Sequence, residues 1–376
     1  MDPIKVGIIG YGFSVKCFHL PFLLSLPEYK VFAFFQRAEA PKDPKSAESG
    51  SHCTVDHPEV KHYRTADEFF ADTDVEVVIV CSKQDTHAEY AERALSAGKH
   101  AVVEKAFTRT SEEADRVINL AKQKGLILTV FQNRRWDSDF LTLSHLIHKN
   151  ALGEINEAEI HYDVDFPFWM RGMTAKKYTP GDGLMFGLGS HTIDQALLLF
   201  GPPKSITCFL RVLRGVDSET EDSFTLILQY DSPLLVTVKT NIASCMRDQD
   251  QPKYFVRGSK GSYVKHATCI QEQQIFDGMK PTDPKFGVED VSLNGVLTTS
   301  EPFEEKSQTH DAKSKKYVGR YPTIAGHWLG FYENLAEAIR GKAEVAVKPE
   351  QSRDGIKIME LARLSYEKGQ TISWGQ

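Results

Sequence analysis

Short runs of consecutive apolar residues, separated by helix signatures, constrain the fold of this chain more than any other feature. Such runs without polar alternation are typical of strands covered on both faces, as in a parallel sheet. Capping boxes are predicted between them, at Thr86 with Glu89 and at Thr110 with Glu113. Strands alternating with helices predict a doubly wound α/β domain. The runs are IKVGIIG, VFAFFQ, VEVVIVCS, HAVVEKA and LILTVFQN, at residues 4–10, 31–36, 75–82, 100–106 and 126–133.

The pattern changes near residue 135, which predicts two domains, 1–135 and 136–376. After a predicted helix at about 139–150, strand-like runs follow one another with turn residues between them, so we expect a mainly antiparallel sheet. Residues 279–320 are polar and are predicted to be rich in loops. The runs lie at 155–166, 205–214, 223–230, 234–242, 253–259 and 261–267, and helices are predicted at 326–341 and 350–368.

The composition of the 376 residues is that of a globular protein, with 41% hydrophobic and 26% charged residues and no apolar run long enough to span a membrane. A net charge of -6 argues against nucleic-acid binding. The start, MDPIKVGIIG, has no basic, apolar leader, so no secretory signal is expected. The six cysteines are scattered without a CxxC pair, which favours buried, reduced thiols in a cytoplasmic protein over disulfides or a metal site.

A glycine pair follows the first predicted strand, at Gly10 and Gly12. Gly10 permits a tight turn and Gly12 lets the backbone approach a pyrophosphate at the next helix N-terminus. The third position of the dinucleotide fingerprint is Val15, and the alternative is a strand-to-helix turn without a ligand. The position of the pair inside a βαβ pattern favours nucleotide binding.

Gln36 and Arg37 end the second predicted strand, where an acidic residue would bind the adenosine ribose hydroxyls. Arg37 is suited to a 2′-phosphate, so NADP(H) is predicted over NAD(H); the alternative is a surface arginine.

Glu104 and Lys105 follow the strand at 100–104, and catalytic groups gather at the carboxyl ends of such strands. A partly desolvated lysine there exchanges protons readily with a substrate hydroxyl. A solvated lysine at a strand end is the alternative.

Taken together, GYGFSVKCFHLP, VCSKQDTH, the Glu104-Lys105 pair and GLGSHTID resemble motifs of the Gfo/Idh/MocA family of sugar and polyol dehydrogenases, in the same order. QNRRWDSDFLT (132–142) followed by GSHTIDQALLLFG is similar to the branch that contains NADP-dependent scyllo-inositol dehydrogenases. The resemblance implies a Rossmann domain, then an α/β domain whose large, mainly antiparallel open sheet mediates homodimers or homotetramers. It implies a sugar or polyol substrate bound between the two domains.

The resemblance also implies roles for individual residues. Lys105 matches the family's catalytic lysine, and His191 matches the histidine that contacts the substrate hydroxyl and accepts its proton. Asp194 would bind substrate hydroxyls or orient His191, and its alternative is a local ion pair. The remaining matches are Gly10, Gly12, Phe13, Arg37, Ser82, His87, Glu104 and Asn133 for the cofactor, and Arg134, Trp136 and Trp169 for the substrate. For Arg134 and Trp136 the alternatives are an interdomain salt bridge and a core position.

Two positions depart from the family pattern. Ala106 replaces the proline of a Glu-Lys-Pro signature, and because a non-proline cis bond costs about 3 kcal/mol, a trans peptide is expected after Lys105. Gly187 replaces an aspartate four residues before His191, on what would be the same helix face.

The sequence therefore predicts hydride transfer between NADP(H) and a hydroxyl-bearing carbon of a sugar, sugar derivative or cyclitol, without a metal. A non-catalytic nucleotide-sensing regulator on the same fold is the alternative, which the loss of the aspartate at position 187 would suit and which retention of Lys105 and His191 opposes. A third reading, glycoside hydrolysis with NAD, is opposed by Arg37.

Overall fold

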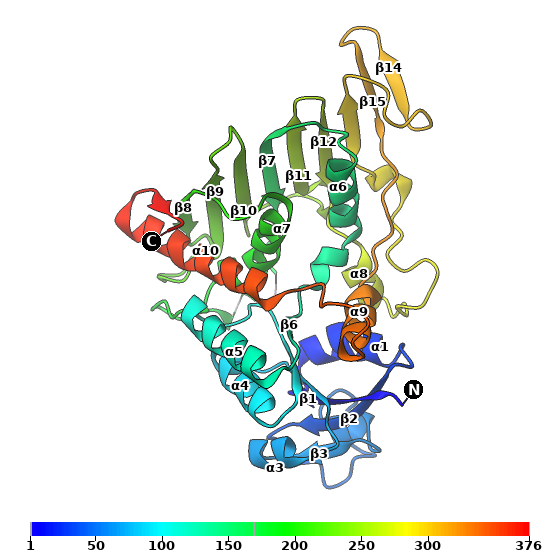
Figure 1. Ribbon diagram of the computed structural model, residues 1–376, viewed down its shortest axis with the longest axis vertical. Helices are drawn as coiled ribbons and strands as arrows, with labels where there is room; N and C mark the ends of the chain where they lie inside the picture. The colour runs from blue at the N-terminus through cyan, green and yellow to red at the C-terminus, as the bar shows by residue number, and fades with distance from the viewer. Residues whose placement is uncertain (1, 168–169, 171, 376) are drawn as a thin grey trace. The chain divides into compact units, whose positions relative to one another are not determined.

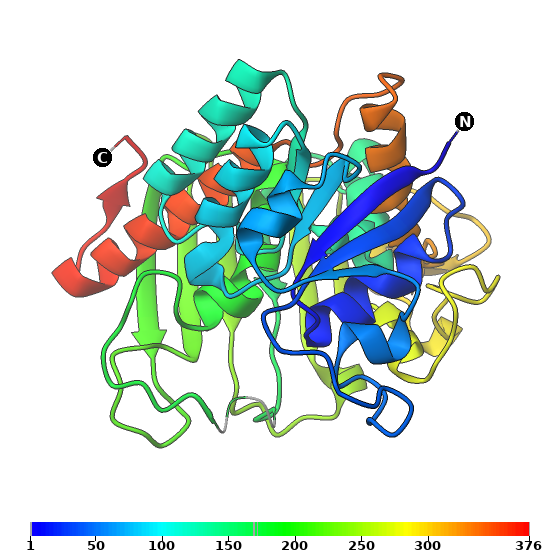
Figure 2. The same ribbon diagram turned by 90° about the horizontal axis from the view of Figure 1, so that it is seen from below.

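The computed structural model describes residues 2–167, 170 and 172–375. Contacts divide the chain into two compact units (Figures 1 and 2). The first unit comprises Met1–Asn133, Gln273–Pro284 and Trp328–Arg353, and the second comprises Arg134–Glu272, Lys285–His327 and Asp354–Gln376. The predicted domain ranges, 1–135 and 136–376, remain predictions.

The first unit contains a parallel sheet in the order β3-β2-β1-β4-β5-β6, which confirms the doubly wound α/β class. Its central strands are apolar on both faces; all four residues of β4 are buried. The short β3 has no apolar run and was not predicted. The strands are β1 (Ile4–Ile9), β2 (Tyr29–Phe35), β3 (Lys61–Tyr63), β4 (Val77–Val80), β5 (His100–Val103) and β6 (Leu128–Val130).

Helices α4 and α5 lie side by side against this sheet (Figures 1 and 2). Thr110 caps α5 as predicted, because its Oγ1 accepts a hydrogen bond from the Glu113 amide at 3.2 Å. Thr86 stands at the N-cap of α4, but the predicted capping box is wrong, because a 3₁₀ turn, Gln84–Thr86, precedes the helix and the Thr86 hydroxyl donates to the Lys83 carbonyl instead. The helices are α1 (Leu20–Leu23), α2 (Cys53–Asp56), α3 (Ala66–Ala71), α4 (His87–Ser96), α5 (Ser111–Lys124) and α9 (Leu329–Ile339).

Helix α9 comes from the C-terminal half of the chain but packs in the first unit. The Tyr29 hydroxyl donates to the Tyr332 carbonyl at 2.6 Å, and the rings of Trp328 and Phe22 lie 6.0 Å apart. Trp328 and Tyr332 are both buried. The core beside the parallel sheet of the first unit is therefore completed by residues about 300 positions beyond β1.

The second unit contains a ten-stranded sheet in the order β14-β15-β13-β12-β11-β7-β10-β9-β8-β16. Every adjacent pair is antiparallel except β7 with β10, which confirms a mainly antiparallel sheet. The strands are β7 (Ile155–His161), β8 (Ser205–Arg211), β9 (Ser223–Gln229), β10 (Leu235–Thr240), β11 (Pro252–Gly258), β12 (Gly261–His266), β13 (Val296–Thr299), β14 (Gln308–Asp311), β15 (Lys316–Arg320) and β16 (Ile372–Ser373).

Strands β13, β14 and β15 lie within residues 279–320, which were expected to be mostly loop. The expectation failed there because these strands are only four or five residues long and β14, at the edge of the sheet, has three of its four residues exposed. Strands β14 and β15 are held mainly by backbone pairing along the sheet, whereas β13 also buries Leu297 and Thr299.

Helices α6 and α7 lie over one face of the sheet of the second unit (Figure 1). The strands alternate accordingly: β10 buries Val236, Val238 and Thr240, while its other residues are half-buried or exposed. No described helix of the chain is long and apolar enough to cross a membrane. The remaining bounds are α6 (Ser138–His148), α7 (Ser190–Phe200), α8 (Gln271–Phe276) and α10 (Pro349–Lys368).

Candidate active site

The turn after β1 has the geometry of a phosphate cradle. Gly10 has φ +96°, and a Cβ there would lie 2.7 Å from the Cys81 carbonyl oxygen, so only glycine fits. A Cβ on Gly12 would meet no heavy atom within 4 Å, so this part of the turn is open to a ligand. Val15, at the third fingerprint position, is fully buried at the start of a π-helical turn, Val15–His19.

A cavity of about 500 Å³ opens beside this turn. Its wall carries two cations and a carboxylate, and the exposed Arg37 is one of the cations. Space next to Gly10 and a guanidinium at the end of β2 fit the adenosine end of a dinucleotide. Residues of the wall include Gly10, Arg37, Ser82, Lys83, Asp85 and Tyr90. Phe13 lies nearby in sequence, with 59% of its side chain exposed and its ring 5.7 Å from that of Phe18.

Glu104, just after β5, is the centre of a buried hydrogen-bond network in the first unit. Its Oε1 accepts bonds from the Ser14 hydroxyl and from His19 Nε2, the latter at 3.0 Å, and its Oε2 accepts from the Lys105 amide at 3.0 Å. Burial by itself would raise the pKa of Glu104, but these bonds and the charges of His19 and Lys105 hold the pKa at about 2. His19 Nδ1 lies 2.5 Å from the Tyr332 hydroxyl. Glu104 is therefore a fixed negative charge beside Lys105.

The peptide between Lys105 and Ala106 is cis, so the expected trans bond was wrong. The expectation used only the intrinsic preference of a non-proline peptide and none of the local contacts. In the structure the Lys105 amide donates to Glu104, and the Ala106 carbonyl accepts a hydrogen bond from His87 Nδ1 at 3.0 Å. The side chain of Lys105 is half-buried at the carboxyl end of β5.

His87, predicted to lie on the cofactor side, is 2% exposed at the start of α4. Its Nδ1 bonds the Ala106 carbonyl, and its Nε2 lies 3.2 Å from the Ser82 carbonyl. Burial lowers the pKa of His87, which favours the neutral ring. His87 thus links the segments after β4 and β5, which carry Ser82 and Lys105.

His191 lies in the first turn of α7, directly after a second π-helical turn, Met185–Gly189. The wider turn means that positions 187 and 191 are not related by the simple four-residue spacing of an α-helix, which the prediction had assumed. A Cβ on Gly187 would lie 3.4 Å from Leu184 Cδ2, an ordinary contact, so the position has room for a side chain.

The start of this π-helical turn is held by Glu221. Its carboxylate accepts a hydrogen bond from the Met185 amide at 3.2 Å and is paired with Arg363. Burial raises the pKa of Glu221. A buried ion pair therefore fixes the segment that leads into the His191 helix.

Asp194 forms a buried bidentate ion pair with Arg135 in the second unit. Arg135 Nε lies 2.8 Å from Asp194 Oδ2, and its Nη2 lies 2.7 Å from Oδ1. This geometry corresponds to the local ion pair that was the alternative for Asp194. Arg135 itself was not predicted, although it stands beside Arg134 in the NRRW string.

Tyr162 gathers several predicted site residues of the second unit. Its hydroxyl accepts a hydrogen bond from Arg134 Nη2 at 2.5 Å, and its ring centroid lies 6.4 Å from that of His191. Arg134 also pairs with Glu272 and with Asp137. Tyr162 and Glu272 have no sequence motif, because each lies more than 25 positions from Arg134 and reaches it only through the fold.

The predicted residues thus fall into one group in each unit. Asn133 and Trp136 bound a 3₁₀ turn where the chain passes from the first unit to the second. Trp169 lies outside the described residues. The first group contains Gly10, Gly12, Phe13, Arg37, Ser82, His87, Glu104 and Lys105, and the second contains Arg134, His191 and Asp194.

Among the described residues, two groups have side chains of metal-binding type within 4.8 Å of one another, His52 with Cys53 and His62, and His19 with Cys81 and Glu104. The prediction of a metal-free site therefore stays a prediction. All six cysteines are free, and three of them are buried; Cys245 is exposed, which the expectation of buried thiols did not include.

Comparisons with known proteins agree with this geometry. Residues 4–132 match the oxidoreductase family with an NAD-binding Rossmann fold, and residues 140–264 match the GFO/IDH/MocA C-terminal domain. An uncharacterized oxidoreductase of Schizosaccharomyces pombe is 36% identical, over 99% of this chain and 100% of that protein. The scyllo-inositol 2-dehydrogenase (NADP(+)) IolW of Bacillus subtilis is 33% identical, over 99% of this chain and 96% of that protein.

Solved structures of oxidoreductases are also similar to this chain. The yvaA protein of Bacillus subtilis superposes with a TM-score of 0.85 at 32% identity, over 99% of this chain and 98% of that one. An oxidoreductase from Bacillus cereus superposes with a TM-score of 0.83 at 27% identity, over 98% of each chain. With both domain models matched in order and relatives aligned nearly end to end, the chain belongs to the Gfo/Idh/MocA family of oxidoreductases.

Proposed function

We propose that the protein is an NADP(H)-dependent oxidoreductase that acts on a hydroxyl-bearing carbon of a sugar, sugar derivative or cyclitol. The observation that carries the proposal is Lys105 beside the ionised Glu104 at the carboxyl end of β5. The inositol substrate in the name of the IolW relative supports a polyol. When bound, the nicotinamide supplies the hydride chemistry.

Proton transfer is the part of the reaction that this chain's own side chains perform. A CH–OH group that loses hydride must also lose its hydroxyl proton, and we assign that proton to Lys105 and His191. The charge of Lys105 helps to lower the pKa of Glu104, so the carboxylate and the lysine interact directly. The ion pair of Arg135 with Asp194, on the turn below His191 in α7, holds this helix in place.

The preference for NADP(H) rests on Arg37 at the wall of the cavity beside Gly10. We expect Arg37→Ala to raise the Kd for NADP+ about 10- to 100-fold while the Kd for NAD+ changes less than about threefold, because only NADP+ carries the 2′-phosphate. Arg64→Ala, another exposed arginine of the first unit, is the matched control. Tighter binding of NAD+ than of NADP+ by the wild type would overturn the preference.

The activity itself is tested by a panel of polyols, aldoses, sugar acids and cyclitols with both nucleotides, followed by absorbance at the reduced nicotinamide band. Turnover of at least one compound with NADP(H) is the expected result. Gly187, in place of a carboxylate, favours a second candidate, a nucleotide-sensing regulator. Tight dinucleotide binding with no turnover of any compound would support that candidate.

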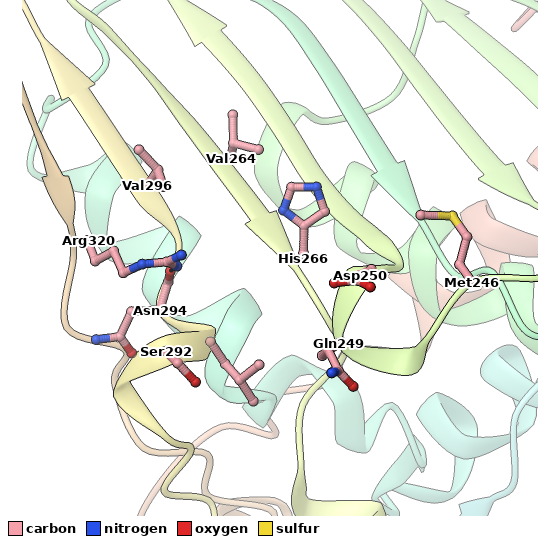
Figure 3. Close-up of a pocket in the computed structure, with 10 residues that line it drawn as sticks. Met246, Gln249, Asp250, Val264, His266, Ser292, Asn294, Val296 and Arg320 are labelled. Atoms are coloured by element: carbon pink, nitrogen blue, oxygen red, sulfur yellow. Dashed lines mark hydrogen bonds between the residues drawn. The ribbon is translucent and has the colours of Figure 1, made fainter.

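We also propose a cytoplasmic homodimer or homotetramer that assembles through the sheet of the second unit. The face of this sheet away from α6 and α7 carries apolar side chains between charged pairs, and Phe209 is 55% exposed on it. A cavity of about 650 Å³ lies along it, where Val264, His266 and Val296 project from neighbouring strands (Figure 3). The free cysteines suit a reducing compartment. Light scattering that gives the mass of one chain would contradict the assembly.

A further inference from the structure

Lys253 is a buried lysine to which the described residues offer no carboxylate partner within 4.0 Å. Its side chain is 1% exposed, at the start of β11. Its ammonium lies 5.4 Å from the ring centroid of Tyr162 and 5.1 Å from that of Tyr254. Within the part of the chain that the structure describes, the ammonium of Lys253 makes no hydrogen bond or ion pair. Because aromatic faces compensate only part of the hydration that a buried ammonium loses, this charge is left to be satisfied by something else.

A β-bulge places Lys253 on the inner face of the sheet. In the pairing of β11 with β12, Pro252 lies opposite His266 and Tyr254 lies opposite Lys265, and the register shifts at the residue between them. Lys253 and Tyr254 are consecutive yet both are buried, whereas consecutive residues of a regular strand point to opposite faces. Bulges of this kind re-aim side chains and are common beside active sites.

Lys265, on the neighbouring strand β12, is a buried lysine of the same sheet whose charge is fully paired. It is fully buried, and its ammonium lies 3.0 and 3.1 Å from the two carboxylate oxygens of Glu289 and 2.6 Å from the Leu293 carbonyl. Around Lys253, the carboxylates of Asp137 and Asp139 are close enough to act on the hydroxyl of Tyr254. Among the described ion pairs, however, neither carboxylate lies within 4.0 Å of the Lys253 ammonium.

Lys253 shares a neighbour with the residues proposed for the substrate. Tyr162 contacts Lys253 through its ring, accepts a hydrogen bond from Arg134, and lies beside the ring of His191. The other cations of this cluster are already neutralised, Arg134 by Glu272 and Asp137, and Arg135 by Asp194. Lys253 is the cation of this group that remains available to an anion.

We propose that Lys253 binds an anionic group of the substrate, a carboxylate or a phosphate on the sugar or cyclitol. This inference rests on the proposed function and narrows it, because it excludes neutral polyols as the preferred substrates. The substrate's negative charge supplies the ion pair that the described chain does not give to Lys253, next to the residue proposed to accept the hydroxyl proton. Lys253 is a substrate-binding residue in this proposal and takes no part in the proton transfer.

The test compares charged and neutral compounds on wild-type protein and on Lys253→Met, Lys253→Arg and Lys204→Met. Lys204 lies just before β8 of the same sheet, pairs with Asp231 and serves as the control. The probes are glucose with glucuronate and gluconate, and myo-inositol with its monophosphate. For each probe, kcat/KM with NADP+ and the Kd by calorimetry at saturating NADP+ are measured. Circular dichroism and thermal melting establish that each variant folds.

We expect the wild type to prefer one of the acidic probes, and Lys253→Met to lower that preference about 10- to 100-fold in kcat/KM and in Kd, as for loss of a charge-assisted hydrogen bond. Lys253→Arg retains most of this preference, and Lys204→Met leaves it unchanged. If carboxylates show the preference and the phosphate does not, the anion is a carboxylate, and the reverse result assigns a phosphate.

Failure of this inference is distinguishable from failure of the proposed function. Equal turnover of neutral and acidic probes by wild type and Lys253→Met overturns the inference and leaves the oxidoreductase proposal standing. Charge-selective binding that Lys253→Met abolishes, with no turnover of any probe, supports the inference and overturns the catalytic proposal. If Lys253→Met does not fold, loss of charge selectivity in Lys253→Gln decides the question, and unchanged selectivity there overturns the inference.

Discussion

In each unit a buried carboxylate lies close in sequence to a residue proposed to move protons, Glu104 before Lys105 and Asp194 three positions after His191, but the two carboxylates are held by different chemistry. In the first unit, Glu104 accepts hydrogen bonds from a histidine, a serine and the backbone of Lys105 itself. In the second unit, both oxygens of Asp194 are bound by the single guanidinium of Arg135. Glu104 therefore stays in direct electrostatic contact with Lys105, whereas the charge of Asp194 is neutralised by a partner that stays protonated.

The difference indicates different duties for the two carboxylates. The ionised Glu104 interacts directly with the charge of Lys105, so we assign it to the chemistry. A neutralised Asp194 anchors the helix that carries His191, so it belongs to the positioning of that helix. Replacing residues of the two pairs should then have separable effects on rate and on stability.

The largest effect is expected at the two proton-handling residues. Lys105→Met should lower kcat/KM about 10²- to 10⁴-fold, because a positioned acid–base group contributes that much. His191→Gln should lower it by a smaller factor within the same range, since the amide still bonds a hydroxyl. The Kd for NADPH, measured by fluorescence, should change little in His191→Gln. An exposed-lysine control, Lys124→Met, should match the wild type. Full activity in Lys105→Met would contradict the assignment of Lys105 and Glu104 to the chemistry.

Removing Arg135 is expected to destabilise the second unit by about 3–5 kcal/mol, because Arg135→Met leaves the buried Asp194 carboxylate uncompensated. The free energy of unfolding is measured by urea denaturation. The double variant Arg135→Met with Asp194→Leu should recover most of the loss, since no buried charge remains. A loss below about 1 kcal/mol for Arg135→Met would show that water reaches the pair.

Glu104 gives the first unit a pH dependence. Its pKa is lowered from an ordinary 4.5 to about 2, so its contribution to stability is complete above pH 4.5 and is lost as the pH falls towards 2. The contribution is on the order of 3 kcal/mol. Glu104→Gln should flatten the dependence of unfolding free energy on pH in this window. Parallel curves for the variant and the wild type would contradict the assigned shift.

The smallest effect is expected at Gly187, where a substitution tests whether the segment before His191 has room for a side chain. Gly187→Ala should change the free energy of unfolding by less than about 1 kcal/mol, because its Cβ has only an ordinary contact with Leu184. Gly189→Ala is the matched control: its Cβ would lie 2.8 Å from the Phe224 ring, so a loss of about 1–3 kcal/mol is expected. Equal melting temperatures for the two variants would contradict this difference.

Local patterns were sufficient to predict the architecture of both units. Apolar runs and turn residues located most strands, and the Gly10 turn and the Glu104-Lys105 pair lie at strand ends, where sequence is informative. The partners of His19 and Arg134 were not predictable in this way, because Tyr332 and Glu272 are brought close only by the fold. The relation of Gly187 to His191 was missed for a related reason: the π-helical turn Met185–Gly189 shifts the helix face there, and no residue type marks such a turn.

The β-bulge at Lys253 is another feature that the sequence pattern does not predict. Alternation along KYFVRGS would place Lys253 and Tyr254 on opposite faces, yet both are buried. A bulge depends on the pairing of two strands, and neither strand alone reveals it.

The packing of α9 into the first unit has a consequence for synthesis on the ribosome. Domains generally fold as units while the chain emerges, starting from the N-terminus. Here His19 and the Tyr29 hydroxyl form hydrogen bonds with Tyr332. The core of the first unit therefore cannot be completed until Tyr332 has been synthesised. A nascent chain arrested before Trp328 should therefore remain protease-sensitive in its first 133 residues, even though its parallel strands have all been translated.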